Sequence, residues 1–223
     1  MKGFTATVIV VFFLGFVSGE KTESSRTELG ENAQRERFEK YKAGISENTS
    51  KISTIKSSFR QIKHLSFLSD KVITSGKFFL KKNGGRNLVK WQYTEPFDYQ
   101  IVLDGRNVFM KDGNKVRSFD MSSNSVFEEL NDIMIKSLDG TILTENENFN
   151  FKIYENDGRL YVDMEPSKST MKEYFKRIKI VFDKKDYTVK KLKMIERDGD
   201  STEIFFNDRR INIPLDDSEF QLK

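Results

Sequence analysis

The chain has 223 residues, no cysteine, a single histidine and a formal net charge of +4 at pH 7. The absence of cysteine excludes disulfides, thiol nucleophiles and anchoring through a lipidated cysteine. Basic and acidic residues are interspersed along the sequence, so no concentrated cationic face indicates a nucleic-acid partner.

The first 19 residues have the pattern of a secretory signal peptide. A lysine near the start supplies positive charge, an apolar run follows to Val17, and small residues precede Glu20. The run is shorter than the roughly 20 residues that a membrane-spanning helix needs. We expect cleavage after Gly19 and export to the periplasm, and the alternative is a retained N-terminal anchor.

Residues 20–36 are polar, and we expect them to form a flexible tether. They cannot bury enough apolar surface to offset the entropy lost on ordering. From about Arg37, apolar side chains recur at the spacing of an amphipathic helix, and a break near Gly44 and Asn48 stays open. Residues 37–223 are long enough for one domain with its own core, and a single domain is expected there.

After this helix the hydrophobic period changes to two, which indicates strands. Short turns such as Asn83-Gly84-Gly85 separate the strands, and connections this short make neighbouring strands antiparallel. Strands are expected at residues 57–65, 71–81, 88–94, 99–103, 107–111, 115–119, 149–155, 159–164, 177–183, 188–196 and 201–211. Between the sixth and seventh, residues 125–138 have helical spacing. Eleven consecutive antiparallel strands predict one strongly curved sheet with helices over its apolar face.

Residues for catalysis are sparse. His64 is the only histidine, it lies in an expected strand, and no G-x-S-x-G motif accompanies it. Structural zinc sites need clusters of Cys or His, and the sequence has none. We therefore expect a protein that is not an enzyme and that has no metal or cofactor. A carboxylate-based hydrolase stays open as a class, without a positive feature in its favour.

Residues 76–105 carry the most specific pattern in the chain. It consists of G-x-F from Gly76, W-x-Y-x-x-P from Trp91, and the pair Asp104-Gly105. Together with F-x-Q from Phe59 and the helical insertion, this pattern resembles the LolA family, the periplasmic carriers of lipoproteins. The resemblance covers about residues 37–222.

The resemblance implies a mainly β (α+β) fold, an incomplete antiparallel β-barrel of about 11 strands with a helical lid over a hydrophobic cavity. It implies a monomeric periplasmic chaperone without enzyme activity. Such carriers receive acylated lipoproteins from an inner-membrane ABC transporter and deliver them to an outer-membrane acceptor, and thereby serve outer-membrane biogenesis.

Candidate cavity and lid residues follow from the same resemblance. They are Phe59, Phe78, Leu80, Trp91, Tyr93, Phe127, Leu130, Met134 and Leu138. Each of them could equally be an ordinary core residue, because cavity walls and cores use the same residue types. Phe78 and Phe79 cannot both point inward on a regular strand.

In the family, an arginine shortly before the tryptophan bonds to the lid and helps it to close. Arg86 is the matching candidate here for the lid latch, and Lys82 is the competitor because the preceding loop is longer in this chain.

Two other functions stay open from the sequence. A half-barrel of this kind could be a sensor or interaction module that binds protein partners without transporting lipid. It could also carry another acylated lipid, because hydrophobic walls do not identify their ligand.

Overall fold

The computed structural model describes residues 31–123, 125–139, 141–143, 149–167 and 171–223. The expected signal peptide, and residues 20–30 of the expected tether, lie outside this part of the chain. Eleven strands are described: β1 (Thr54–His64), β2 (Val72–Asn83), β3 (Arg86–Glu95), β4 (Tyr99–Asp104), β5 (Asn107–Asp112), β6 (Lys115–Asp120), β7 (Phe149–Asn156), β8 (Arg159–Pro166), β9 (Phe175–Asp183), β10 (Val189–Glu196) and β11 (Ser201–Ile211). The helical segments are α1 (Glu31–Thr49), η1 (Met121–Ser123), α2 (Ser125–Asp139), η2 (Thr141–Leu143), α3 (Met171–Tyr174) and η3 (Asp217–Phe220).

The strands form a single sheet in the order β6-β5-β4-β3-β2-β1-β11-β10-β9-β8-β7. All neighbouring strands are antiparallel, and β1 pairs with β11, so the first and last strands lie together at the centre. Strands β6 and β7 are the two edges, and they do not pair with each other. The sheet is therefore an open, incomplete barrel, as predicted.

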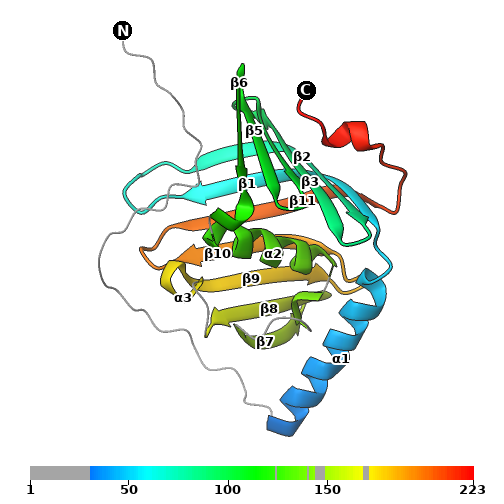
Figure 1. The fold of residues 1–223 in the computed structure, drawn as a ribbon. Coiled ribbons are helices and arrows are strands. Elements are labelled where there is room, and N and C mark those ends of the chain that lie inside the picture. The colour runs from blue at the N-terminus through cyan, green and yellow to red at the C-terminus, as the bar shows by residue number, and fades with distance from the viewer. Residues whose placement is uncertain (1–30, 124, 140, 144–148, 168–170) are drawn as a thin grey trace.

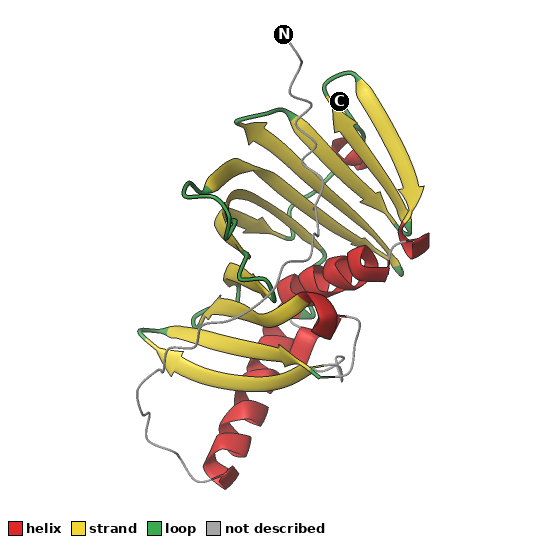
Figure 2. Ribbon diagram, turned by 90° about the vertical axis from the view of Figure 1, so that its left-hand side faces the viewer, coloured by secondary structure: helices red, strands yellow, loops and turns green. Residues whose placement is uncertain are grey.

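Helix α2 connects the two edges of the sheet, because it follows β6 and precedes β7 in the chain. It lies across the concave side of the sheet, while α1 lies at one end of the molecule (Figure 1). Figure 2 shows from another side that the sheet is strongly curved. Among the described residues, no helix combines the length and the hydropathy needed to cross a membrane.

Alternation along the strands places large apolar side chains on both faces of the sheet. In β2, Phe78 points to the concave face, where it packs on Trp91 with ring centroids 4.6 Å apart. Phe79 points to the opposite, convex face, where it packs on Phe220 at 6.5 Å. The prediction that the two phenylalanines point to opposite faces is therefore confirmed.

Gly76 in β2 permits a close approach between two strands. A Cβ atom added there would lie 1.9 Å from the backbone oxygen of Gln92 in β3, at a point where the pairing register shifts. Only a glycine leaves room for this approach, which explains why the G-x-F element begins with one.

Helix α1 differs from the sequence expectation at its start and in its middle. It begins at Glu31 rather than near Arg37, so residues 31–36 of the expected tether are helical. These residues are mostly good helix formers, whose propensity outweighs their polarity. The helix continues through Gly44 and Asn48 to Thr49, so the break that the sequence left open is absent from α1. A Cβ atom at Gly44 would lie 2.7 Å from the Tyr187 hydroxyl, so the glycine lets α1 pack closely on this ring.

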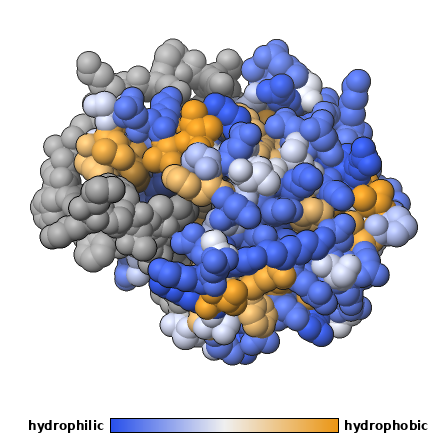
Figure 3. All heavy atoms as spheres, turned by 90° about the horizontal axis from the view of Figure 1, so that it is seen from above, coloured by the Kyte–Doolittle hydropathy of each residue, from blue (hydrophilic) through white to orange (hydrophobic). Residues whose placement is uncertain are grey.

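A C-terminal strap, residues 213–223, covers part of the convex face. Its Leu215 and Phe220 form a second apolar cluster with Phe79, Leu88 and Val102, separate from the main core. Hydrophilic side chains dominate the face of the molecule seen in Figure 3, and hydrophobic side chains form separate patches on it.

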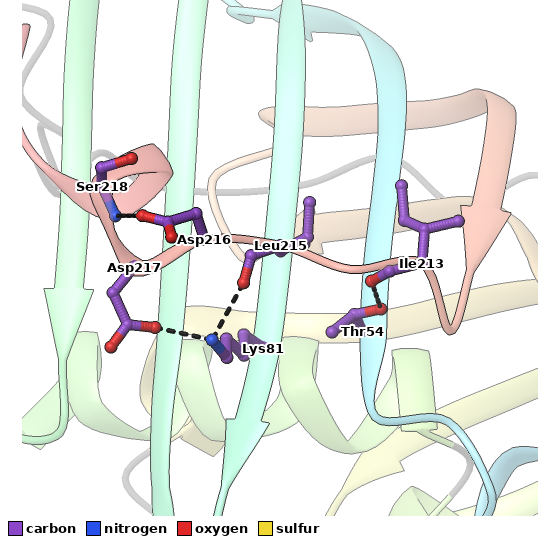
Figure 4. Close-up of polar contacts among 7 residues, drawn as sticks. All are labelled: Thr54, Lys81, Ile213, Leu215, Asp216, Asp217 and Ser218. Carbon is purple, nitrogen blue, oxygen red and sulfur yellow. Dashed lines mark hydrogen bonds and ion pairs between the residues drawn. The ribbon is translucent and has the colours of Figure 1, made fainter.

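Side chains of the sheet hold the strap by donating hydrogen bonds to its backbone carbonyl oxygens (Figure 4). The Nζ of Lys81 donates to the Leu215 carbonyl oxygen at 2.9 Å and contacts the Asp217 carboxylate at 2.6 Å. Thr54 Oγ1 donates to the Ile213 carbonyl oxygen at 2.7 Å. Further along, the buried Lys90 donates to the Gln221 carbonyl oxygen at 2.7 Å.

Candidate functional site

Helix α2 is amphipathic, and its apolar side faces the concave surface of the sheet. Phe127, Leu130, Ile133 and Met134 recur at intervals of three and four residues, which places them on one side of a helix. Ile133 is buried in the main core, and the other three are half-buried against it. A helix of this kind can cover an apolar surface while it keeps charged residues in water.

A cavity of about 180 Å³ lies between α2 and the sheet. The apolar lining residues are Trp91, Tyr93, Tyr99, Ile101, Leu103, Phe127, Leu130, Ile133, Met134, Phe175, Leu192, Met194 and Ile204. The polar and charged lining residues are Gln61, Lys63, Asn131, Glu196 and Thr202. A concave, mostly apolar space with a few polar groups is the usual form of a small-molecule site.

The structure divides the nine predicted cavity and lid residues into two groups. Trp91, Tyr93, Phe127, Leu130 and Met134 line the cavity. The others are buried in the main core beside it without lining it, and they are Phe59, Phe78, Leu80 and Leu138. A contribution of either group to ligand binding stays a prediction.

The buried group supports the lining residues from behind. The ring of Phe59 packs edge-on against Trp91 and Tyr93, with centroid distances of 4.9 and 5.0 Å. The ring of Phe78 also packs against Trp91, with centroids 4.6 Å apart, and against Phe206, with centroids 5.8 Å apart. This aromatic packing fixes the orientation of Trp91 toward the cavity.

Several lining residues were not among the candidates from the sequence. Phe175, Leu192, Met194 and Ile204 come from strands outside the segment with the family motif, and Ile101 comes from β4, between the motif residues. Alternation in each strand indicates which of its faces is apolar. It does not indicate how close a residue lies to α2, because that depends on the order of the strands in the sheet.

Arg86 lies on the convex face, away from α2. It shares this face of β3 with Leu88, whereas Trp91 and Val89 face the concave core. Its guanidinium group forms an ion pair with Asp104 of β4 through two nitrogen–oxygen contacts. The half-buried Lys82 lies opposite Asn87 in the β2–β3 pairing, on the same face of β2 as Phe78.

A different arginine contacts α2. Arg106, in the turn between β4 and β5, forms an ion pair with Glu128 of α2, with Nη2 and Oε1 3.2 Å apart. Both side chains are largely exposed, at 65% and 42%. The sequence carried no local signal for this contact, because β5, β6 and η1 separate Arg106 from α2 in the chain.

Tyr93 has its hydroxyl group in the apolar surroundings of the cavity. Burial is the main cause that raises the pKa of Tyr93, and the nearby Tyr99 raises it further. The phenol therefore stays neutral in the physiological pH range. The hydroxyl donates to Gln61 Oε1 at 3.3 Å. One polar lining residue is therefore already engaged by the protein itself.

Several solved structures are similar to this chain in fold. A DUF1329 family protein from Desulfovibrio piger is 15% identical with a TM-score of 0.47, over 81% of this chain and 96% of that one. Lipoprotein LppX from Mycobacterium tuberculosis is 11% identical with a TM-score of 0.47, over 81% and 98%. A chain from the MucA/MucB complex of Pseudomonas aeruginosa is 7% identical with a TM-score of 0.48, over 84% and 61%.

A comparison with curated proteins found no match. The family model described as outer membrane lipoprotein carrier protein LolA matches residues 50–223, which include every strand of the sheet and helix α2. The chain therefore belongs to the LolA family.

Proposed function

We propose that this protein is a periplasmic carrier that covers the acyl chains of lipoproteins and takes them from the inner to the outer membrane. The observation that carries the proposal is the apolar cavity between the concave sheet and the amphipathic helix α2. In this proposal an inner-membrane ABC transporter supplies the acylated lipoprotein, and an outer-membrane acceptor receives it.

The physical need for such a cover is large. Transfer of an acyl chain of about 16 carbons into water costs on the order of 13 kcal/mol, at about 0.8 kcal/mol per CH₂ group. An apolar site that excludes water removes most of this cost while the ligand crosses an aqueous compartment.

The cavity of about 180 Å³ corresponds to a closed state. An apolar cavity of about 150 Å³ holds one benzene molecule, and sites for larger ligands measure roughly 300–1,000 Å³. Helix α2 must therefore move outward before an acyl chain can enter. When the ligand leaves, the apolar side of α2 packs on the sheet again and competes with rebinding.

The contacts that hold α2 are suited to such a movement. The ion pair between Arg106 and Glu128 is exposed, and exposed ion pairs contribute no more than about 1 kcal/mol. The aromatic contact between Phe119 of β6 and Phe127 of α2, at 5.6 Å, is near an edge of the sheet.

Exposed apolar side chains lie at the ends of strands that line the cavity. Phe67 is 78% exposed in the loop after β1, which carries Lys63, and Phe97 is 56% exposed in the loop after β3, which carries Tyr93. Their position supports transfer of the ligand to partner proteins at this end of the cavity.

Trp91 provides a direct test, because it is the only tryptophan in the chain and it lines the cavity. We expect an acyl chain brominated near its middle to quench Trp91 fluorescence in a saturable way, since bromine quenches on contact. A non-brominated chain of the same length should bind without this quenching and serves as the control. Absence of saturable quenching, with no displacement by the non-brominated chain, would favour the sensor or interaction module.

A reversible cross-link tests whether α2 is the lid. Since the chain has no cysteine, Arg106→Cys and Glu128→Cys would introduce the only two thiols, and a reducible bis-maleimide could join them. We expect the cross-linked protein to lose quenching and to regain it after reduction of the linker. Equal quenching in both states would contradict the lid role of α2.

Native mass spectrometry of protein purified from the periplasm would identify the ligand. Co-purified acylated lipoprotein supports the proposal, whereas free lipid alone would indicate a carrier of another acylated molecule.

A further inference from the structure

A second hollow lies on the other side of the sheet from the cavity. It is a groove of about 550 Å³ on the outer face of strands β7 to β11. Near its centre is Val181 of β9, whose neighbours Ile180 and Phe182 both belong to the main core. Alternation along the strand therefore places Val181 on the convex face. The side chains that hold the strap come from β1 to β5, so the groove lies on the other half of this face.

Two tyrosine rings begin a regular row of side chains across this groove. Tyr154 of β7 and Tyr161 of β8 lie directly opposite each other, and their rings are stacked with centroids 5.1 Å apart and planes 1° apart. This distance is close to the spacing of about 4.8 Å between neighbouring strands. In the next strand the residue opposite Tyr161 is Val181, and in the strand after that Lys191 lies opposite Val181. The row therefore runs straight from β7 to β10 along one face.

The place of a third ring in this row is open. Val181 has a short side chain, and it belongs to neither of the two apolar clusters. Beyond it, the Lys191 side chain is directed toward β11. Its Nζ lies 4.8 Å from the centroid of the Phe205 ring and 2.8 Å from Glu203 Oε2. A planar ring above Val181 would lie about one strand spacing from Tyr161, within the roughly 4.5–7 Å at which aromatic rings stack.

The walls of the groove carry an excess of positive charge. Among the described residues that line it, five are lysine or arginine and two are acidic, Asp163 and Asp183. Glu203 contacts both Lys191 and Lys193, which reduces the excess without cancelling it. A groove of this charge favours a ligand that carries negative charge. Its volume also lies in the range of small-molecule sites, roughly 300–1,000 Å³.

We propose that this groove binds a small planar aromatic anion, such as an aromatic carboxylate, whose ring stacks on Tyr161 above Val181. Lys191 lies on the opposite side of the ring, where its ammonium group can move from Phe205 to the face of the ligand. Lys179 lies two residues from Val181 on the same face of β9, in a position to contact the acidic group. The groove is separate from the acyl cavity, so this inference goes beyond the proposed function and does not depend on it.

Three compounds of similar size test which chemistry the groove recognises. The first, 2-naphthoate, has both a planar ring and a negative charge. Decalin-2-carboxylate keeps the charge without the planar ring, and 2-naphthylmethanol keeps the ring without the charge. By isothermal titration calorimetry, we expect the wild-type protein to bind 2-naphthoate about tenfold more tightly than either of the others. The affinity for 2-naphthoate should fall as the salt concentration rises, because screening weakens exposed charges.

A variant that fills the open place tests the position of the ring. Val181→Tyr adds a third ring to the row, and we expect it to weaken 2-naphthoate binding by at least about tenfold because its own side chain occupies the site. The matched control is Val116→Tyr, which adds the same ring to an exposed position in β6, and there the affinity should stay at the wild-type value. Tyr161→Leu removes the stacking partner but keeps an apolar side chain. It should also weaken binding by about tenfold, and it provides the test if Val181→Tyr does not fold.

The outcomes separate this site from the acyl cavity. We expect 2-naphthoate to stay bound when a saturating acyl chain is added, and both Val181→Tyr and Tyr161→Leu to retain Trp91 quenching by the brominated acyl chain. Displacement of 2-naphthoate by the acyl chain would place it in the cavity and overturn the assignment. Equal affinities for 2-naphthoate and decalin-2-carboxylate, or wild-type affinity in both variants, would also overturn it and leave the carrier proposal standing. Binding of 2-naphthoate without any acyl quenching would support the groove and contradict the carrier.

A short peptide tests whether the occupant is instead part of a protein. A tripeptide with a tyrosine between two aspartates, blocked at both ends, presents an aromatic ring and negative charge in that form. We expect it to bind more weakly than 2-naphthoate. Tighter binding that Val181→Tyr abolishes would overturn the assignment to a small molecule and identify the groove as a docking site for an acidic partner.

Discussion

A different segment covers each face of the sheet, and the two segments are attached to the sheet by different kinds of contact. On the convex face, the strap of residues 213–223 packs Leu215 and Phe220 onto an apolar cluster and is tied through its backbone carbonyl groups by Lys81 and Lys90. On the concave face, helix α2 covers a cavity, and an exposed side-chain ion pair joins it to the β4–β5 turn.

This difference indicates which cover can be released. Opening the strap would expose an apolar cluster and leave the Lys90 ammonium, which is 1% exposed in the structure, without its carbonyl partner. Opening α2 breaks an exposed ion pair and exposes residues that a bound acyl chain would cover again. We infer that the strap is a permanent part of the fold and that α2 is the movable part.

Equivalent truncations in the two covers should separate them most strongly. Phe220→Ala in the strap removes a buried ring, and we expect the free energy of unfolding to fall by about 3 kcal/mol. Phe127→Ala in α2 removes a half-buried ring, and a smaller loss of about 1 kcal/mol is expected. Urea denaturation followed by Trp91 fluorescence measures both.

The two variants should affect acyl binding in the opposite order to their effects on stability. Phe220→Ala should leave quenching of Trp91 by a brominated acyl chain unchanged, because the strap lies on the other face. Phe127→Ala should weaken it, because Phe127 lines the cavity. Equal effects of both variants on stability and on binding would contradict the division into a permanent and a movable cover.

Two exposed arginine pairs give a smaller and more specific effect. Arg106→Gln removes the ion pair with Glu128 of α2, and we expect the population of open lid to rise by up to about fivefold, since such pairs contribute no more than about 1 kcal/mol. Arg86→Gln removes the pair with Asp104 on the convex face and is the matched control.

Stopped-flow quenching of Trp91 measures the rate at which a brominated acyl chain enters. Entry should be faster in Arg106→Gln than in the wild type, and the difference should shrink at high salt because screening weakens exposed pairs. Arg86→Gln should enter at the wild-type rate. A faster rate in Arg86→Gln alone would instead support Arg86 as the residue that holds the lid.

The pattern of residues was sufficient to predict every strand, the helical insertion and a strongly curved sheet, because alternation of apolar residues and Gly-containing turns act locally. The incomplete barrel was what the family resemblance implied. The same alternation contained the information that Arg86 points away from the lid: it lies an odd number of positions from Trp91, so the two residues take opposite faces of β3.

The position of the cavity was less accessible from the sequence. Phe78 and Leu80 share the concave face with Trp91, yet they pack in the core beside the cavity and do not line it. Which residues lie beneath α2 depends on the pairing of β1 with β11, which joins segments about 150 residues apart and leaves no local pattern in either. The contact of Arg106 with Glu128 joins residues 22 positions apart across β5 and β6, and no local pattern marks it either.

The smallest predicted effect is on helix α1, which a hydrogen bond joins to β7. The Tyr41 hydroxyl donates to Glu155 Oε2 at 2.6 Å, and Lys184 contacts the other oxygen of this carboxylate at 2.5 Å. The hydrogen bonds from Lys184 and Tyr41 lower the pKa of Glu155 from its ordinary value of 4.5.

Because the folded-state pKa of Glu155 lies below the unfolded value, this contribution to stability is fully present above pH 4.5 and is lost as the pH falls through the lowered pKa. The protection of the α1 amides against hydrogen exchange, relative to their intrinsic rate at each pH, should therefore fall in mild acid before the sheet unfolds. Tyr41→Phe removes one of the two hydrogen bonds, so the change should begin at a higher pH than in the wild type. An identical pH profile in wild type and Tyr41→Phe would show that another contact fixes the helix, and that Tyr41 stabilises it through the packing of its ring alone.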